Sequence, residues 1–234
     1  MMQQLSIFPI RNQILSSLSP ASLERLSPDL EPIELTHATP VFQAYQPITH
    51  VYFPERAMAS FMATTAEGGS SEIGVVGGEG AAGLEVLMGV DESPHECVMQ
   101  VAGPGYRIRK DALRREFKRG GKMHDIVLLF MHKLMTQVSQ ITLCNRLHSL
   151  EERMSRWLLM CHDRIDGDRI SLTQEFLSLL LGVRRESVTL TAGQMQSNGI
   201  LQYSRGRIQV IDRLGLERSA CECYEVVRSE YART

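Results

Sequence analysis

The sequence predicts an α+β protein with an N-terminal β jelly-roll, a long helix and a C-terminal winged helix-turn-helix domain. Short apolar runs separated by turn-forming residues occupy positions 33–108, which is typical of antiparallel strands. Over forty residues without glycine or proline follow Gly121, which predicts long helices. Two short helical patterns then meet at Gly182 and precede a hairpin pattern. We therefore expect the three parts at 1–120, 121–147 and 148–234.

The composition indicates a folded protein with a small basic patch. The chain has 234 residues, of which 43% are hydrophobic, enough for ordinary cores in one or two domains. A net charge of −2 argues against a surface coated in base for non-specific nucleic-acid binding. Between positions 184 and 213, however, five arginines accompany only two acidic residues. Any contact with a polyanion must therefore come from this local patch.

The sequence contains no recognisable signal for export or for insertion into a membrane. It contains no run of about 18 apolar residues, so we expect no membrane span and no membrane partner. Its N-terminus lacks the basic start and apolar core of a signal peptide. Five cysteines, an odd number without repeated spacing, do not form a disulfide framework. We expect a cytoplasmic protein.

The N-terminal part begins with short helices and continues as strands. Helical spacing of leucines and isoleucines over 12–30 is interrupted by Ser-Pro at 19–20 and 27–28, which predicts short helices and turns. The following apolar runs are closely spaced, as in an antiparallel barrel or jelly roll. These runs cover 48–53, 58–63, 72–76 and 97–101.

The long helix has a heptad-like apolar stripe. Its members recur at alternating steps of four and three residues, the period of a coiled-coil seam. They are Val127, Met131, Leu134, Val138 and Ile141. The stripe either packs against its own domain or forms a parallel homodimer interface. We favour the homodimer, because a two-fold symmetric reader gains affinity by covering two half-sites.

The C-terminal part has the order expected of a winged domain. An amphipathic helix over 147–161 ends at the Asp-Gly-Asp turn of 166–168. Strands at 200–203 and 207–211 form a hairpin, the wing, after the two-helix element. We expect one final helix over 216–231 with Asp212 as its possible cap.

The stretch 172–189 has the pattern of a helix-turn-helix. Thr173 begins the first helix, where its hydroxyl can cap free amides and approach a phosphate. Gly182 allows the turn. The second helix opens with Arg184-Arg185-Glu186, at the end that projects deepest into a DNA major groove.

Arginine can donate two hydrogen bonds to guanine, and glutamate can accept one from cytosine, so Arg185 and Glu186 are the expected base readers. We expect Thr173, Arg184, Ser187, Arg205 and Arg207 to contact phosphates, which position a protein without specifying sequence. The alternative is that Arg185 and Glu186 merely decorate a solvated helix.

These residues carry a family resemblance. From about 145 to 231 the chain resembles the winged-helix domain of the Crp/Fnr family of bacterial transcription regulators, through the motifs at 172–175, 182–188 and 197–201. The resemblance implies a homodimer bound to double-stranded DNA, with Arg185 and Glu186 reading bases and RNA polymerase as a further candidate partner. Thr189 matches a position that some oxygen-responsive members use for a base. Leu190 stands where cyclic-AMP-responsive members have a second base-reading arginine, so their operator sequence does not transfer.

The N-terminal half resembles the family's cyclic-nucleotide-binding-like domain only in architecture. The segment 74–84 has the glycines and one glutamate of the nucleotide site. The phosphate-binding arginine is missing, because 93–97 fills its place and Glu96 has the wrong charge. A buried anion without a cation is costly, so we expect no cyclic AMP binding. The same glycine loop lacks the Lys-Ser/Thr of a P-loop, so we expect no enzyme.

We expect no cofactor and no metal. No cysteine precedes Cys97, so the N-terminal iron–sulfur cluster of oxygen-sensing members is absent. Cys221 and Cys223 are two apart, and on a continuous helix their side chains would diverge by about 200°. Cys97, Cys144 and Cys161 are expected to be buried as small hydrophobes. The effector stays open, and the alternative function is a small-ligand or redox sensor that signals through protein contacts.

Overall fold

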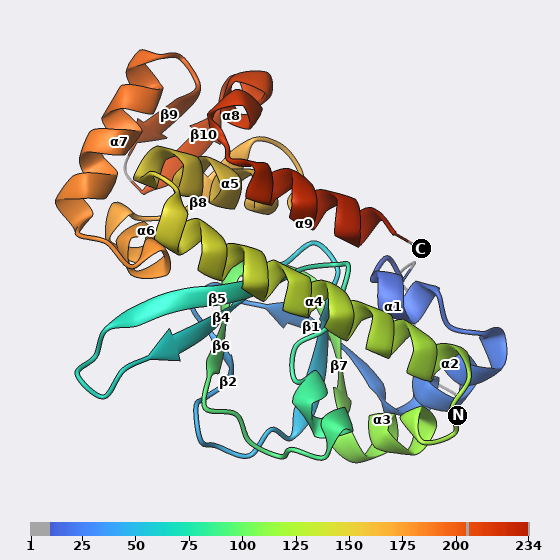
Figure 1. Ribbon diagram of the computed structural model, residues 1–234. Helices are drawn as coiled ribbons and strands as arrows, with labels where there is room; N and C mark the ends of the chain where they lie inside the picture. Colours follow the sequence, from blue (N-terminus) through green and yellow to red (C-terminus); the bar gives the residue numbers. More distant parts are fainter. Residues whose placement is uncertain (1–9, 205, 234) are drawn as a thin grey trace.

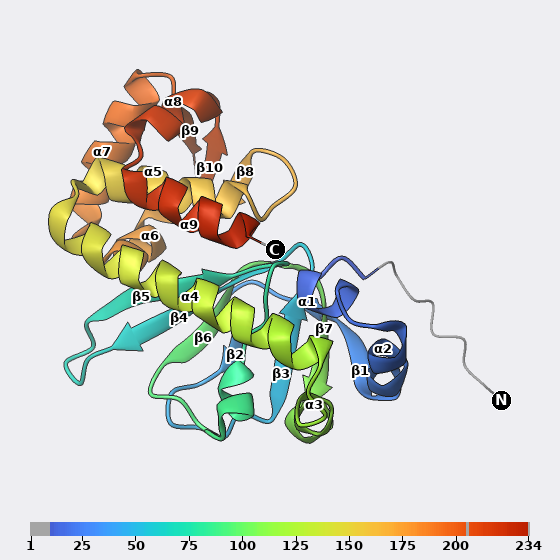
Figure 2. The same ribbon diagram turned by 45° about the vertical axis from the view of Figure 1, so that its right-hand side comes forward.

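The computed structural model describes residues 10–204 and 206–233. Figure 1 shows a β-rich N-terminal part, a helical C-terminal part and the long helix α4 (Lys122–Leu147) running between them. The turned view in Figure 2 shows the same arrangement, with α9 (Glu222–Ala232) beside α4. The α+β fold class and the order of its parts are as the sequence predicted.

Serine-proline pairs shape the N-terminal helices as expected. Ser19 caps α2 (Pro20–Leu26) by accepting a hydrogen bond from the Ser22 amide, and Pro20 occupies the first helical position, where no amide donor is needed. The second pair lies in the 3-10 helix η1 (Ser27–Asp29), directly after α2. The short helix α1 (Gln13–Ser16) precedes them.

Two antiparallel sheets enclose the N-terminal core. The three-stranded sheet has the order β1-β7-β3, and the four-stranded sheet has the order β2-β6-β4-β5. Side chains from both sheets, including Phe53 and Phe61, belong to one buried cluster. The strands are β1 (Leu30–Leu35), β2 (Pro40–Phe42), β3 (His50–Pro54), β4 (Met58–Thr64), β5 (Ser70–Val76), β6 (Glu96–Val101) and β7 (Gly103–Arg109).

The chain leaves the sheets through a helix and a glycine pair. The 3-10 helix η2 (Leu84–Met88) lies between β5 and β6, and α3 (Lys110–Phe117) follows β7. Gly120 and Gly121 have φ angles of 75° and 71°, a left-handed conformation that favours glycine. This pair therefore ends α3 and starts α4 in a new direction.

The predicted dimer stripe on α4 largely packs against its own chain. Val127 is 0% exposed and Ile141 is 3% exposed. Leu134 and Val138 lie beside Gly74 of β5, and the partly buried Met131 joins the same core. The expectation that Val127 and Ile141 form a dimer interface is therefore wrong. An amphipathic helix buries one stripe, and the rest of the chain already covers this one.

A buried polar side chain anchors α4 to β5. Gln137 accepts a hydrogen bond from the Val75 amide at 2.6 Å and donates one to the Val75 carbonyl at 3.2 Å. The glutamine amide thus satisfies backbone groups on the outer edge of the sheet, as a further strand would. By length and mean hydropathy alone α4 could span a membrane, yet this face is bound to the sheet.

The C-terminal part is a small winged domain. Ser149 and Glu152 form a capping box at the start of α5 (Leu150–His162). A three-stranded antiparallel sheet of order β8-β10-β9 contains the wing, which confirms the predicted hairpin. Its elements are β8 (Arg169–Ser171), α6 (Gln174–Leu181), α7 (Arg185–Ser197), β9 (Leu201–Ser204) and β10 (Arg207–Val210).

The final helix is broken in two. The sequence predicted one helix over 216–231, whereas the structure has α8 (Arg213–Ser219) and α9. Ala220 and Cys221 between them have extended backbone angles, with ψ of 152° and 166°. Asp212 occupies the N-cap position of α8 but makes no capping hydrogen bond. The break sets the positions of the cysteines on either side of the α9 start.

Candidate DNA-binding site

The turn between α6 and α7 follows from local sequence. The Thr173 hydroxyl accepts a hydrogen bond from the Phe176 amide at 3.1 Å and so caps α6. Gly182 ends α6 with a φ of 61°, in the left-handed region. The buried residues Leu177, Leu181 and Val188 fill the angle between the two helices. These contacts fix the direction in which α7 leaves the turn.

The first turn of α7 presents charged side chains to solvent. Arg184 occupies the N-cap position, and Arg185 and Glu186 follow it, all three exposed. An Arg185 guanidinium nitrogen lies 3.8 Å from a carboxylate oxygen of Glu175 on α6. Both partners are exposed, so this ion pair contributes little and does not hold Arg185 in place. Figure 1 shows α7 at the outer edge of the helical part, beside the wing strand β9.

Thr189 is held more firmly than Arg185. Its hydroxyl lies 2.8 Å from Gln174 Oε1 and 3.0 Å from the Arg185 carbonyl oxygen, and it can donate to either. Gln174 is a residue whose role sequence reasoning missed, although it lies inside the motif used for the resemblance. The next turn of α7 carries the exposed Leu190, followed by Gly193 and Gln194. This surface is short of positive charge beyond the first turn.

The wing lies beside the start of α6. The Leu172 amide donates to the Gly206 carbonyl at 2.8 Å, and the Tyr203 hydroxyl donates to the Leu172 carbonyl at 3.2 Å. These bonds bring the exposed Arg207 of β10 to the same end of the domain as Thr173. Ser187 is half-buried, and the predicted phosphate contact Arg205 lies outside the described residues.

Comparison with known proteins identifies this arrangement. A family profile of the Crp-like helix-turn-helix domain matches residues 152–219. A protein from Eubacterium rectale, assigned to the crp/fnr family of transcriptional regulators, has a similar structure, with a TM-score of 0.70 and 17% identity over 91% of this chain and 97% of its own. FixK2 from Bradyrhizobium japonicum is also similar, with a TM-score of 0.69 and 14% sequence identity. The match covers 82% of this chain and 98% of FixK2. No curated protein matches the chain.

The profile match covers the helix-turn-helix, and the structural matches cover nearly the whole chain. Residues 152–219 therefore belong to the Crp-like helix-turn-helix family, and the chain shares its fold with solved structures of Crp/Fnr-family regulators. Its C-terminal part therefore contains a helix-turn-helix domain of the DNA-binding type. The third similar structure is CLP from Xanthomonas campestris, described as a c-di-GMP-responsive global regulator, with a TM-score of 0.64 and 14% identity over 83% of this chain and 100% of its own.

The nucleotide-like segment of the N-terminal part is occupied by side chains of the protein itself. A Cβ placed on Gly80 would lie 2.0 Å from the Phe130 ring, so α4 packs directly on the glycine loop. The Glu79 carboxylate accepts a hydrogen bond from the Arg164 guanidinium at 2.8 Å, and Arg164 comes from the C-terminal part. Glu96 lies on β6 and is half-buried. The single glutamate of the segment thus ties the two parts of the protein together.

A second buried carboxylate lies at the same junction. Glu72 of β5 accepts hydrogen bonds from Ser60 Oγ at 2.5 Å and from Trp157 Nε1 at 2.9 Å. Burial raises the pKa of Glu72 to about 7, against the opposing effect of these hydrogen bonds. No sequence signal marked Glu72, because it lies in an apolar strand and its tryptophan partner is 85 residues away.

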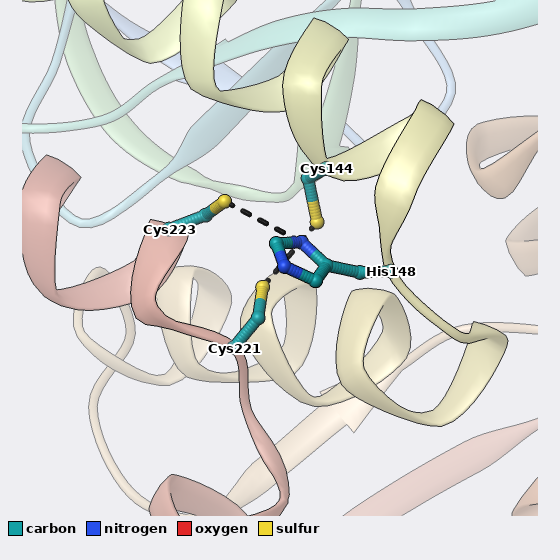
Figure 3. Close-up of side chains that lie close together, drawn as sticks. All are labelled: Cys144, His148, Cys221 and Cys223. Atoms are coloured by element: carbon teal, nitrogen blue, oxygen red, sulfur yellow. Dashed lines mark hydrogen bonds between the residues drawn. The ribbon is translucent and has the colours of Figure 1, made fainter.

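The structure also overturns the argument against a cysteine site. Cys221 lies at the N-cap of α9 with extended backbone angles, so it does not share a helix with Cys223. All five cysteines are buried, as expected for Cys97, Cys144 and Cys161. Cys144 and His148, however, lie beside Cys221 and Cys223 (Figure 3). Sequence reasoning missed this group, because its two halves are more than seventy residues apart.

Proposed function

We propose that this regulator binds double-stranded DNA as a homodimer and reads the sequence with the first turn of α7. The observation that carries the proposal is the exposed Arg185-Glu186 pair at the start of α7, inside the Crp-like helix-turn-helix domain. Arg185 can donate two hydrogen bonds to one guanine, and Glu186 can accept one from a cytosine amino group. Each good pairing discriminates by about 1–3 kcal/mol.

The remaining contacts divide by chemistry. Thr189 reads a base only if its hydroxyl leaves Gln174, so it is the most conditional of the proposed base contacts. Phosphate contacts come from the start of α6, the start of α7 and the wing, and they position the protein without specifying sequence. The proposed phosphate-contacting residues are Thr173, Arg184, Ser187, Arg205 and Arg207.

The dimer interface lies on the outward face of α4. Leu128, Met135 and Thr142 repeat every seven residues and are exposed. Together with Met131 and Val138 they give alternating steps of three and four, which is a coiled-coil register. A large exposed apolar face on a long helix favours a partner, and a second copy supplies the same face in a parallel pair.

A matched pair of substitutions tests the dimer. Met135 and Leu147 are 64% and 66% exposed on α4, but only Met135 lies in the proposed register. Met135→Glu places two like charges across the interface and should shift the protein toward monomers in sedimentation experiments. Leu147→Glu should leave the dimer intact. If the two variants had the same proportion of dimer, the interface would lie elsewhere on the protein.

The effector of this regulator is not cyclic AMP. The segment that would hold the nucleotide is closed by Phe130, and its glutamate is already paired with Arg164. No arginine stands at the phosphate position, where Glu96 would repel the ligand. Cyclic AMP should therefore leave the DNA affinity unchanged.

Selection of bound DNA from a random pool tests the whole proposal. The purified full chain should enrich a two-fold symmetric sequence with half-site centres about one helical turn apart. Repeating the selection with cyclic AMP should give the same sequence, and repeating it with c-di-GMP tests the ligand of the Xanthomonas relative. Enrichment of no sequence, with a retained ability to capture proteins, would favour a sensor that signals through protein contacts.

A further inference from the structure

Four metal-binding side chains converge where α4, α5 and α9 meet. Cys144 comes from α4, His148 is the residue that ends it, and Cys221 and Cys223 lie at the start of α9 (Figure 3). Their ligand atoms all lie within 4.8 Å of one another. Cys144 Sγ is 3.4 Å from Cys221 Sγ, and Cys223 Sγ is 3.6 Å from His148 Nδ1.

We propose that these four side chains form a tetrahedral Cys3His site for a single zinc ion. Structural zinc sites take four ligands, commonly cysteine and histidine. Bond lengths of about 2.3 Å to sulfur and about 2.0 Å to nitrogen put neighbouring ligand atoms of a tetrahedron about 3.8 Å apart for two sulfurs and about 3.5 Å for sulfur and nitrogen. The observed 3.4 and 3.6 Å match this spacing before any metal is placed.

The orientation of His148 supports the site. Its Nδ1 faces the three thiols, while its Nε2 lies 3.4 Å from a carboxylate oxygen of Glu222. Histidines that bind metals usually donate their other ring N–H to a carboxylate, which fixes the tautomer and orients the ring. Glu222 therefore acts as a positioning residue that presents the Nδ1 lone pair to the ion.

The charge around the four ligands also supports a zinc site. A zinc ion with three thiolates and a neutral histidine carries one net negative charge. Arg156 on α5 is buried and interacts with Cys144. Within the described part of the chain no carboxylate lies at ion-pair distance from Arg156, and its Nε has no hydrogen-bond partner. A buried cation without an anion is costly, and the metal–thiolate complex supplies the missing charge.

Two other fates of these thiols fit less well. A Cys144–Cys221 disulfide needs a sulfur–sulfur distance of about 2.05 Å and would leave Cys223, His148 and Arg156 without a role. In an iron–sulfur cluster the protein ligands are spread over different iron atoms, whereas all four ligand atoms here fit around one ion. The metal analysis described below distinguishes a disulfide and an iron–sulfur cluster from a zinc site.

The site would fasten α9 to the joint between α4 and α5. His148 lies between the end of α4 and Ser149, which caps α5. The helix that packs on the sheets thus connects here to the domain that carries α6 and α7. Because Cys221 is 77 residues from Cys144, a bound ion would close a long loop and stabilise the packing of α9.

Metal analysis of the full chain tests the proposal. Protein purified without chelators should contain about one zinc ion per chain, released by mercurial titration of its thiols. Replacement by Co²⁺ should give the intense visible bands of tetrahedral cobalt with thiolate charge transfer in the near ultraviolet. Cys223→Ala and His148→Ala should each lower retained zinc at least about 10-fold. Cys161→Ala, a buried cysteine outside the group, is the matched control and should retain full zinc.

A gentler variant separates metal binding from folding. Glu222→Gln keeps all four ligands, and it should weaken zinc affinity about 10–100-fold in a chelator competition while the circular dichroism spectrum is unchanged. The proposal is overturned if wild-type protein binds neither Zn²⁺ nor Co²⁺ stoichiometrically. Iron with cluster absorption, a Cys144–Cys221 disulfide in non-reducing peptide mapping, or equal zinc loss in Cys161→Ala would overturn it too. None of these measurements involves DNA, so they are independent of the proposed function.

Discussion

Two arginine–glutamate pairs in this protein make opposite use of charge. Arg164 and Glu79 lie 2.8 Å apart at the junction of the two parts, and their side chains are 8% and 12% exposed. Arg185 and Glu175 lie 3.8 Å apart on the helix-turn-helix surface, and they are 63% and 67% exposed. A buried pair is costly to break, whereas an exposed pair adds little to stability. The first pair is therefore part of the scaffold, and the second leaves Arg185 free for a partner.

The largest effect should come from breaking the buried pair. Arg164→Ala leaves the Glu79 carboxylate buried without its cation and removes the cation–π contact with Tyr231. We expect a loss of about 3–5 kcal/mol in the free energy of unfolding, measured by urea denaturation. Arg185→Ala is the control and should change it by no more than about 0.5 kcal/mol. Similar losses in the two variants would remove the contrast between the pairs.

A pH effect of comparable size should come from Glu72. Its pKa is about 7 in the folded protein, against 4.5 for an ordinary glutamate. Above the ordinary pKa the unfolded chain releases this proton while the folded protein keeps it, so stability falls as pH rises between these values. The fall is on the order of 3 kcal/mol and ends once the folded carboxyl is also ionised. Urea denaturation of wild type and Glu72→Gln across about pH 4 to 8 checks it.

In Glu72→Gln the pH dependence of stability over this interval should be smaller by that amount. The glutamine oxygen can still accept the hydrogen bond from Trp157, so the fold should persist. If wild type and variant showed parallel stability curves, Glu72 would be ionised in the folded protein throughout.

Replacing Arg185 of the exposed pair should have a smaller effect, and it should change only the affinity for DNA. Arg185→Ala should reduce affinity for the selected operator by about 1–3 kcal/mol, roughly 5- to 150-fold, and relax one base position. Fluorescence anisotropy with the operator and a scrambled duplex measures both effects. An unchanged preference for the operator would mean that Arg185 is only a solvated side chain of α7.

The smallest effect should come from the wing. Arg207→Ala should weaken binding to the operator and the scrambled duplex alike and lower the slope of log K against log salt by about 1. Affinity measurements over a range of salt concentrations give this slope. A loss confined to the operator would make Arg207 a base reader and not a phosphate contact.

Local signals made the helix-turn-helix predictable. Thr173, Gly182 and the wing hairpin act within a few residues of their own position through caps, turns and alternation. Short apolar runs separated by turn residues likewise identified the β-rich part, and the glycine pair at 120–121 identified the start of the long helix. Nothing comparable marked Glu72 or Gln137, because each is a polar residue whose partner lies in another part of the chain.

The sequence alone does not decide which face of α4 is buried. The apolar pattern permits two seven-residue registers, one through Val127 and Ile141 and the other through Leu128 and Met135. Both share Met131 and Val138, so periodicity alone cannot choose between them. The tertiary structure decides between them, because it buries Val127 and Ile141 and leaves Leu128 and Met135 exposed.

The sequence by itself determined most element types, their order and the helix-turn-helix motif, because caps, turns and hydrophobic periods depend on neighbouring residues. Only the tertiary structure decided which face of α4 is buried, which arginine is locked to Glu79 and which thiols meet His148. Those choices depend on contacts between residues 62 to 85 positions apart. Such contacts leave no local pattern, since chain packing brings the partners together only after the elements have formed.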